Sequence, residues 1–157
     1  MYKKILVAID TTHPEEVKKA LERTLQIGLL TRATVYVVHV ARSHIIPGDI
    51  TGGAGLGVRS ADDDVEGEGE NRKAVQELID RLADAGVDAH GEIVSAPEHD
   101  TASVILQRAK ELAVDLLVLE YQHHRAGGYV FRHSVAEQII NQHPPISILL
   151  SRSPAGN

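Results

Sequence analysis

The chain has 157 residues, none of them cysteine or tryptophan, and it contains only four tyrosines and one phenylalanine. Without cysteine, it has no disulfide framework, thiolate zinc site or cysteine nucleophile. With so few aromatic side chains, we do not expect a platform that stacks the bases of a single nucleic-acid strand. The absence of cysteine also fits the reducing cytoplasm, where we expect the protein to act.

Long hydrophobic stretches and an excess of positive charge are absent as well. No apolar run approaches the ~20 residues of a membrane helix, and the apolar stretch within MYKKILVAID is too short for a signal peptide. Lys and Arg number 16 against 22 Asp and Glu, a net charge of −6. Because nonspecific binding of nucleic acid needs cationic side chains that displace counterions, we expect neither a nucleic-acid partner nor membrane insertion.

The acidity is concentrated in one segment. Six of the 22 acidic residues lie between Asp62 and Glu70, a stretch without Lys or Arg, so the rest of the chain is formally neutral. Residues 43–70 are also rich in glycine and poor in residues that could build a core. This composition predicts a long flexible loop over 43–70, which is a candidate surface for a protein partner.

Short apolar segments alternate with segments of helical periodicity along the chain. The apolar segments predict five strands, at Lys4–Asp10, Thr34–Val40, Val87–Ser95, Asp115–Leu119 and Ile146–Leu150. Helices are expected to begin near Pro14, Asn71, Asp100 and Ser134. Because such alternation implies right-handed crossovers, we expect one doubly wound α/β domain over residues 1–152, with a five-stranded parallel sheet flanked by helices. Residues 153–157 are expected to form a disordered tail.

In open α/β sheets, ligands bind beyond the carboxyl ends of the strands, near the point where the strand order reverses. The positions to consider are residues 10–12, 40–42, 96–100 and 120–134. From the residues alone, Asp10 is first of all a residue that closes a turn or caps the following helix.

The chain resembles the universal stress protein family over nearly its whole length. The resemblance is carried by the order and spacing of Tyr2–Asp10, Val38–Val40, Asp115–Leu119 and Ser134–Ile140, followed by prolines and a final apolar strand. ATP-binding members place an Asp at the end of the first strand on the ribose, and main-chain atoms at the end of the second strand on adenine. The resemblance therefore implies that Asp10 and Val40 bind a nucleotide.

This chain departs from the phosphate-loop pattern of the ATP-binding members. That pattern is Gly, two residues, Gly, nine residues, Gly, then Ser or Thr, and here the three glycine positions carry Glu120, His123 and His133. A charged Glu120 lying 4 Å from a phosphate would be repelled by about 4 kcal/mol at an effective dielectric of ~20. This loop is typical of the members that do not bind nucleotides, so the resemblance implies weak or no ATP binding.

Three residues nevertheless leave an adenine nucleotide as a candidate cofactor. Gly127 and Gly128 offer a displaced flexible pair, and Ser134 opens a helix whose N-terminus favours anions. The predicted cofactor-binding residues are Asp10, Val40, Gly127, Gly128 and Ser134.

The sequence contains neither the ligand spacing of a known metal site nor a catalytic motif. His99, His123, His124 and His133 lack the spacing of a metal site, and adjacent histidines point in different directions. Ser134 lacks the GxSxG elbow of a serine hydrolase. We therefore predict no metal, no catalytic residue and no enzyme.

The resemblance implies a stress-response or regulatory protein that acts as a binding module. Members commonly dimerise by pairing their final strands, here Ile146–Leu150. The alternative is a nucleotide-dependent switch or slow ATPase of the same family.

Overall fold

The structure, a computed structural model, describes residues 1–11, 14–43, 65–97, 100–121 and 134–152. The strands are β1 (Lys4–Ile9), β2 (Thr34–Ser43), β3 (Ala89–Pro97), β4 (Leu116–Tyr121) and β5 (Ser147–Arg152). They form one parallel sheet in the order β3-β2-β1-β4-β5. The helices are α1 (Pro14–Thr31), α2 (Val65–Asp84), α3 (Thr101–Glu111) and α4 (Val135–Asn141). The predicted α/β fold with a five-stranded parallel sheet is confirmed.

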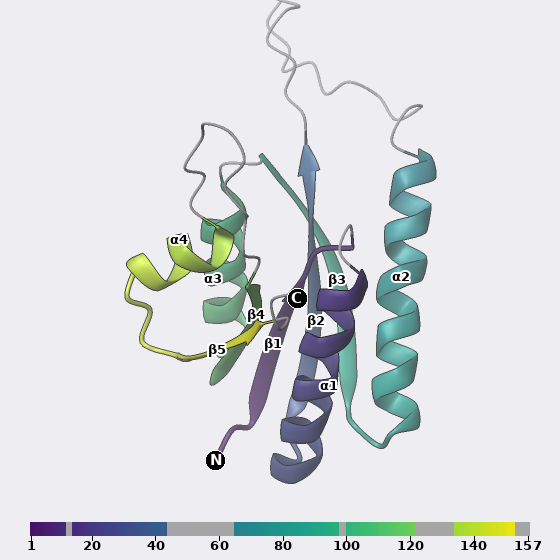
Figure 1. The fold of residues 1–157 in the computed structure, drawn as a ribbon, viewed down its shortest axis with the longest axis vertical. Coiled ribbons are helices and arrows are strands. Elements are labelled where there is room, and N and C mark those ends of the chain that lie inside the picture. The colour runs from purple at the N-terminus through teal and green to yellow at the C-terminus, as the bar shows by residue number, and fades with distance from the viewer. Residues whose placement is uncertain (12–13, 44–64, 98–99, 122–133, 153–157) are drawn as a thin grey trace, which may run out of the picture.

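Helices cover both faces of the sheet, so the domain has three layers (Figure 1). Alternate residues of β1 divide between two apolar clusters. Ile5 and Val7 pack with α1 and α2, whereas Leu6 and Ala8 pack with α3 and α4. The central strands therefore read as continuous apolar runs, as expected of strands buried on both faces.

Close packing of α2 against β3 depends on Gly91. A Cβ atom at this position would lie 2.2 Å from Cδ1 of Ile79 and 2.7 Å from Cγ1 of Val75. Both distances are far below van der Waals contact, so a larger residue would push α2 away from the sheet.

The predicted loop over 43–70 is wrong at both ends. Ser43 belongs to β2, and Val65–Glu70 form the beginning of α2, which was expected to begin near Asn71. Acidic residues favour the N-terminal turns of a helix, and here they accompany a helix that contains Gly67 and Gly69 despite the low helix propensity of glycine. The remaining residues of that prediction, 44–64, lie outside the described residues, as do 153–157.

Most of the predicted strand ends also need correction. β2 ends at Ser43 rather than at Val40, and β3 covers Ala89–Pro97 rather than Val87–Ser95. β5 runs from Ser147 to Arg152, so it begins one residue later and ends two residues later than expected. β4 extends through Glu120 and Tyr121, which were assigned to a loop. Pairing with β5 continues to the register Tyr121↔Arg152, and this extension places Glu120 inside the sheet.

None of the helices in the described ranges combines the length and the apolarity that a membrane span requires.

Candidate functional site

The order of the strands reverses between β1 and β4. From β1 the sheet grows through β2 to β3 on one side, and through β4 to β5 on the other. The connections that leave the carboxyl ends of β1 and β4 therefore turn away from each other, and such a switch point is where open α/β sheets bind ligands. In Figure 1 this edge of the sheet is the upper end of the strands.

Two predicted site residues lie next to each other at this edge. β1 and β2 pair in register up to Ile9↔His39, so Asp10 follows β1 at the level of Val40. Val40 is buried, with 8% of its surface exposed, so its side chain is not available to a ligand. It lies inside β2, in register with Val94 of β3. Asp10 is partly buried at the end of β1.

A third group at the same edge, Glu120, was predicted to lie in a loop, and this prediction was wrong. Glu120 lies in β4, and its Oε1 accepts a hydrogen bond of 3.3 Å from the backbone N–H of Asp10. The register Ala8↔Leu119 puts Glu120 level with Ile9. Because residues alternate between faces, Glu120 shares its face with Val118, which packs toward α1 and α2. Its carboxyl thus lies at the base of the switch point.

Burial raises the pKa of the Glu120 carboxyl from its ordinary value of 4.5 to about 8, because removal from water disfavours the charged form. The nearby carboxylates of Asp10 and Glu16 raise it further, whereas the hydrogen bond from Asp10 opposes the rise. Most Glu120 side chains are therefore neutral at pH 7. The expected repulsion of about 4 kcal/mol assumed an ionised carboxylate, and at neutral pH that assumption is wrong.

Ser134 serves as the N-cap of α4. Its Oγ accepts from the backbone N–H of Glu137 at 3.1 Å, and Oε2 of Glu137 accepts from the N–H of Ser134 at 3.3 Å, which completes a capping box. The hydroxyl of Tyr121 lies 3.5 Å from Oε1 of Glu137, so the cap also borders the end of β4. The prediction that Ser134 opens a helix is confirmed, and its role in ligand binding stays a prediction.

Two polar contacts connect β1 with its surroundings near the same edge. Thr11 donates a hydrogen bond of 2.7 Å from its hydroxyl to Oδ1 of Asn71, which joins the end of β1 to α2. Nδ1 of the buried His39 lies 3.1 Å from the carbonyl oxygen of Ile9. Because a carbonyl can only accept, this contact requires the proton on Nδ1. Neither contact was foreseen, since each joins residues that are at least 30 positions apart.

The remaining predicted residues lie outside the described ranges. These are Gly127 and Gly128 of the cofactor set, and His99, His123, His124 and His133. Among the residues that the structure does describe, no three His, Asp or Glu side chains are grouped to hold a metal ion.

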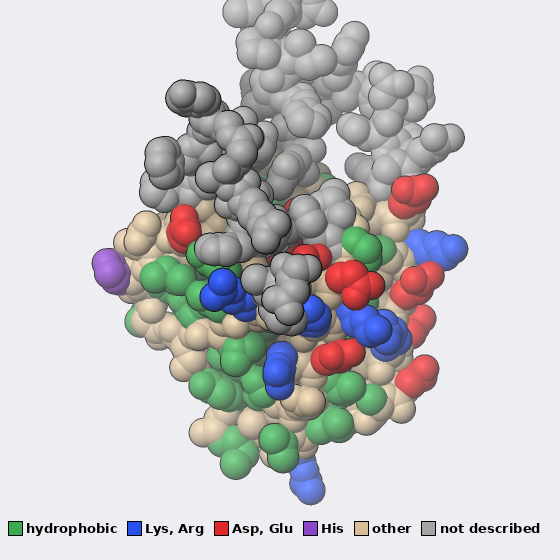
Figure 2. Space-filling view, viewed as in Figure 1, with side chains coloured by type: hydrophobic (Ala, Val, Ile, Leu, Met, Phe, Trp, Pro, Cys, Tyr) green, Lys and Arg blue, Asp and Glu red, His purple; other side chains and the backbone are tan. Residues whose placement is uncertain are grey.

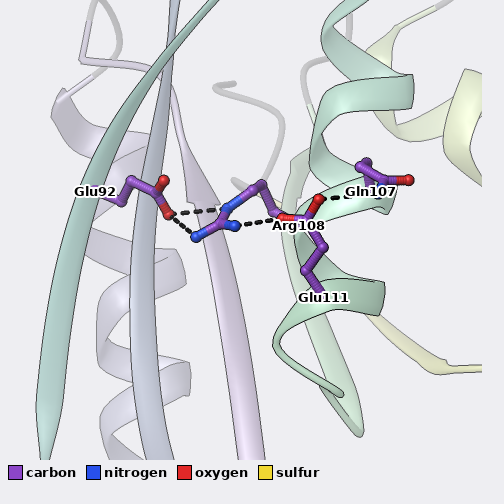
Figure 3. A network of polar contacts seen from close by, with 4 residues as sticks. All are labelled: Glu92, Gln107, Arg108 and Glu111. Carbon is purple, nitrogen blue, oxygen red and sulfur yellow. Dashed lines mark hydrogen bonds and ion pairs between the residues drawn. The ribbon is translucent and has the colours of Figure 1, made fainter.

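A groove on the α3 side of the sheet is separate from the switch point. It encloses about 260 Å³ and is lined in part by Tyr36, His90, Glu92 and Arg108. Figure 3 shows Arg108 of α3 between two carboxylates: its Nε and Nη2 donate to Oε2 of Glu92, and its Nη1 donates to Glu111. Because this network joins α3 to Glu92 of β3, which is level with Val38 and lies on the α3 side of the sheet rather than beyond the strand ends, we assign it to stability.

The edge strand β5 borders an apolar surface. In the described part of the chain β5 pairs only with β4, so its outer edge has no strand partner. Leu150 is 40% exposed, and Leu29 and Leu30 at the end of α1 are 48% and 80% exposed. Figure 2 shows hydrophobic side chains over β5 and the C-terminal half of α1.

Comparison with known proteins gives a consistent result. The model of a family described as the Universal stress protein family matches residues 1–152. Among solved structures, the chain is similar to a universal stress protein in complex with cAMP (TM-score 0.68, 16% identity, 96% of this chain and 97% of that chain). It is also similar to the universal stress protein from Archaeoglobus fulgidus in complex with dAMP (0.64, 20%, 95% and 97%).

A third similar structure is a universal stress protein family protein from Arabidopsis thaliana with AMP bound (TM-score 0.60, 19% identity, 98% of this chain and 93% of that chain). At these identities the likeness establishes the fold alone. No curated protein matched the chain.

Proposed function

Because the chain belongs to the universal stress protein family, we propose that it is a regulatory binding module that takes an adenine nucleotide at the carboxyl ends of β1, β2 and β4. It acts by binding rather than by turnover, in the cytoplasm, in a response to stress. The observation that carries this proposal is the arrangement at the switch point. Asp10 lies level with Val40 there and bonds through its N–H to Glu120.

The roles of the residues follow from their chemistry. The Asp10 carboxylate accepts hydrogen bonds from ribose hydroxyls, which are good donors to a charged acceptor. The main-chain N–H and C=O groups near Val40 bond to the adenine edge, since the Val40 side chain is buried. These roles are supported by the similar proteins that hold cAMP, dAMP and AMP.

Binding of ATP is weak in this proposal. Asp10 and Glu16 lie close enough to Glu120 to raise its pKa, so two carboxylates and the mostly neutral Glu120 gather near the site. A polyphosphate brings three or four negative charges into this field, whereas a monophosphate brings one or two. We therefore expect the ligand to be a nucleoside or a nucleotide of low charge.

The alternative, an ATP-dependent switch or slow ATPase, is favoured by one observation. Glu120 is mostly neutral at pH 7, which removes one of the repulsions that a phosphate would meet. A steady release of phosphate from ATP that is lost in Asp10→Ala would establish this alternative.

We further propose that two copies pair through the outer edges of β5. A flat edge strand with an exposed apolar residue is normally covered or paired, and Leu150 is 40% exposed on β5. Light scattering at micromolar concentration tests this pairing. A dimer that is weakened by Ile148→Asp supports it, and a stable monomer contradicts it.

Isothermal titration with adenosine, AMP and ATP–Mg tests the ligand site. Asp10→Ala removes hydrogen bonds to a charged acceptor, worth ~1.5–3 kcal/mol, so AMP should bind at least tenfold more weakly. Asp80→Ala is the matched control, because Asp80 is exposed on α2 and its Oδ1 accepts a hydrogen bond from Gln76 on the same helix. Absence of binding to the wild-type chain at millimolar concentration would overturn the proposal.

A further inference from the structure

Glu120 holds a polar atom that nothing in the described structure satisfies. Its Oε1 accepts from the N–H of Asp10 at 3.3 Å, whereas its Oε2 is buried and has no hydrogen-bond partner among the described residues. A buried polar atom without a partner is uncommon in folded proteins. In its protonated form, Glu120 has one O–H group that can donate a hydrogen bond. In its ionised form, it would bury a negative charge on an oxygen that has no hydrogen-bond donor among the described residues.

The groups that face Glu120 determine which of the two forms is present. Asp10 comes from the end of β1 and Glu16 from the first turn of α1, and both are acidic. In β5, the residue paired in register with Glu120 is Ser151, which is uncharged. These described neighbours thus supply no cation that would compensate a charged Glu120. Loss of the Glu120 proton would add a further negative charge beside Asp10 and Glu16.

We propose that Glu120 selects the ligand by charge: with its proton, the site accepts an anionic nucleotide, and without it the site retains affinity only for the uncharged nucleoside. This inference rests on the proposed function, since it concerns the same site at the ends of β1 and β4. It follows from position, because Glu120 and Asp10 share a hydrogen bond at the switch point where the ligand enters. Glutamate at this position makes the affinity for phosphate-bearing ligands dependent on pH.

The expected change follows from the pKa of Glu120. With a value of about 8, about nine tenths of the molecules carry the proton at pH 7 and about one tenth at pH 9. If only the protonated form binds an anion, the dissociation constant rises about tenfold between these two pH values. An uncharged ligand meets no repulsion, so its dissociation constant changes less than twofold.

The experiment compares cAMP with adenosine at pH 7 and pH 9 by isothermal titration. cAMP suits the purpose because its phosphodiester carries one negative charge at both pH values, unlike the monoester of AMP. The variant is Glu120→Gln, which keeps the shape and the acceptor for Asp10 but cannot ionise. Glu111→Gln on α3 is the matched control, since Glu111 belongs to the Arg108 network far from this edge.

The inference predicts that cAMP binds about tenfold more weakly at pH 9 in the wild type and in Glu111→Gln, and equally at both pH values in Glu120→Gln. Adenosine should bind equally under all conditions. A wild-type affinity for cAMP that does not change with pH, or an identical change in Glu120→Gln, overturns the inference while the proposed function stands. If neither compound binds to any variant, the proposed function itself fails.

Discussion

The ionisation of Glu120 has a consequence for stability that can be measured without any ligand. The folded state retains the Glu120 proton up to a pKa of about 8, whereas the unfolded chain releases it near the ordinary value of 4.5. Between these values the folded state binds more protons than the unfolded state, so the free energy of unfolding falls as the pH rises. Above about pH 8 both states are ionised and the loss no longer grows.

The magnitude follows from the same two values. At pH 5 the difference in proton binding removes less than ~1 kcal/mol of stability, and at pH 7 it removes about 3 kcal/mol. Glu120→Gln has no ionisable group at this position. We therefore expect the variant to gain about 2 kcal/mol relative to the wild type between pH 5 and pH 7.

Urea unfolding of both proteins at pH 5, 6, 7 and 8 measures this gain. Any cost of burying the Gln amide is the same at every pH, so only the change of the difference with pH counts. Glu111→Gln is the control, because hydrogen bonds from Gln107 and Arg108 lower the pKa of Glu111, so Glu111 is ionised in the folded and unfolded states at these pH values and its variant should differ from the wild type by a nearly constant amount. A stability difference between Glu120→Gln and the wild type that is constant from pH 5 to pH 8 would refute the reasoning.

Four further predictions concern packing, capping, the N-terminal strand and the dimer. Gly91→Ala should lower the free energy of unfolding by about 1–3 kcal/mol through the contact with α2, whereas Gly69→Ala, which meets no atom within 4 Å, should leave it unchanged or raise it in the same urea titration. Ser134→Ala should cost about 1 kcal/mol through loss of the capping box, and an unchanged unfolding midpoint would contradict this. Asp115→Asn should speed amide exchange at the start of β1, because Oδ2 of Asp115 accepts from the N–H groups of Lys3 and Lys4. These hydrogen bonds lower the pKa of Asp115 below the usual value of 3.8, so the slower exchange of the wild type should be lost as the pH falls through that lowered value. Equal exchange rates of the two proteins at pH 7 would contradict this role of Asp115. Ile148→Asp should weaken the dimer in light scattering, and Asp80→Ala on the exposed face of α2 should not.

The elements that the sequence predicts well are those whose apolar pattern is continuous. β1 and β4 are apolar throughout their buried parts, and the capping residue Ser134 marks α4 because the capping box has a local signature. The beginning of α2 was missed because glycines interrupt its acidic first turns, and packing of the helix against β3 is not visible in the local sequence.

The candidate site could be predicted in its position but not in its electrostatics. Asp10 follows β1, and Val40 was predicted to end the second strand, so the rule for parallel sheets brings them to the same edge, although β2 continues to Ser43. The state of Glu120 depends on its burial in β4 and on Glu16 of α1, a residue 104 positions away. No local pattern reports such burial, and the charged carboxylate assumed from the sequence was therefore wrong at neutral pH.

The central claim is that an adenine nucleotide binds at the switch point between β1 and β4. Titration of the ¹⁵N-labelled protein with AMP, followed through the backbone amide signals, tests this claim most directly. The account predicts that the largest shifts occur at the amides of Asp10, Val40 and Glu120. Shifts confined to the groove around Tyr36 and Arg108, or no shifts at millimolar AMP, would contradict it.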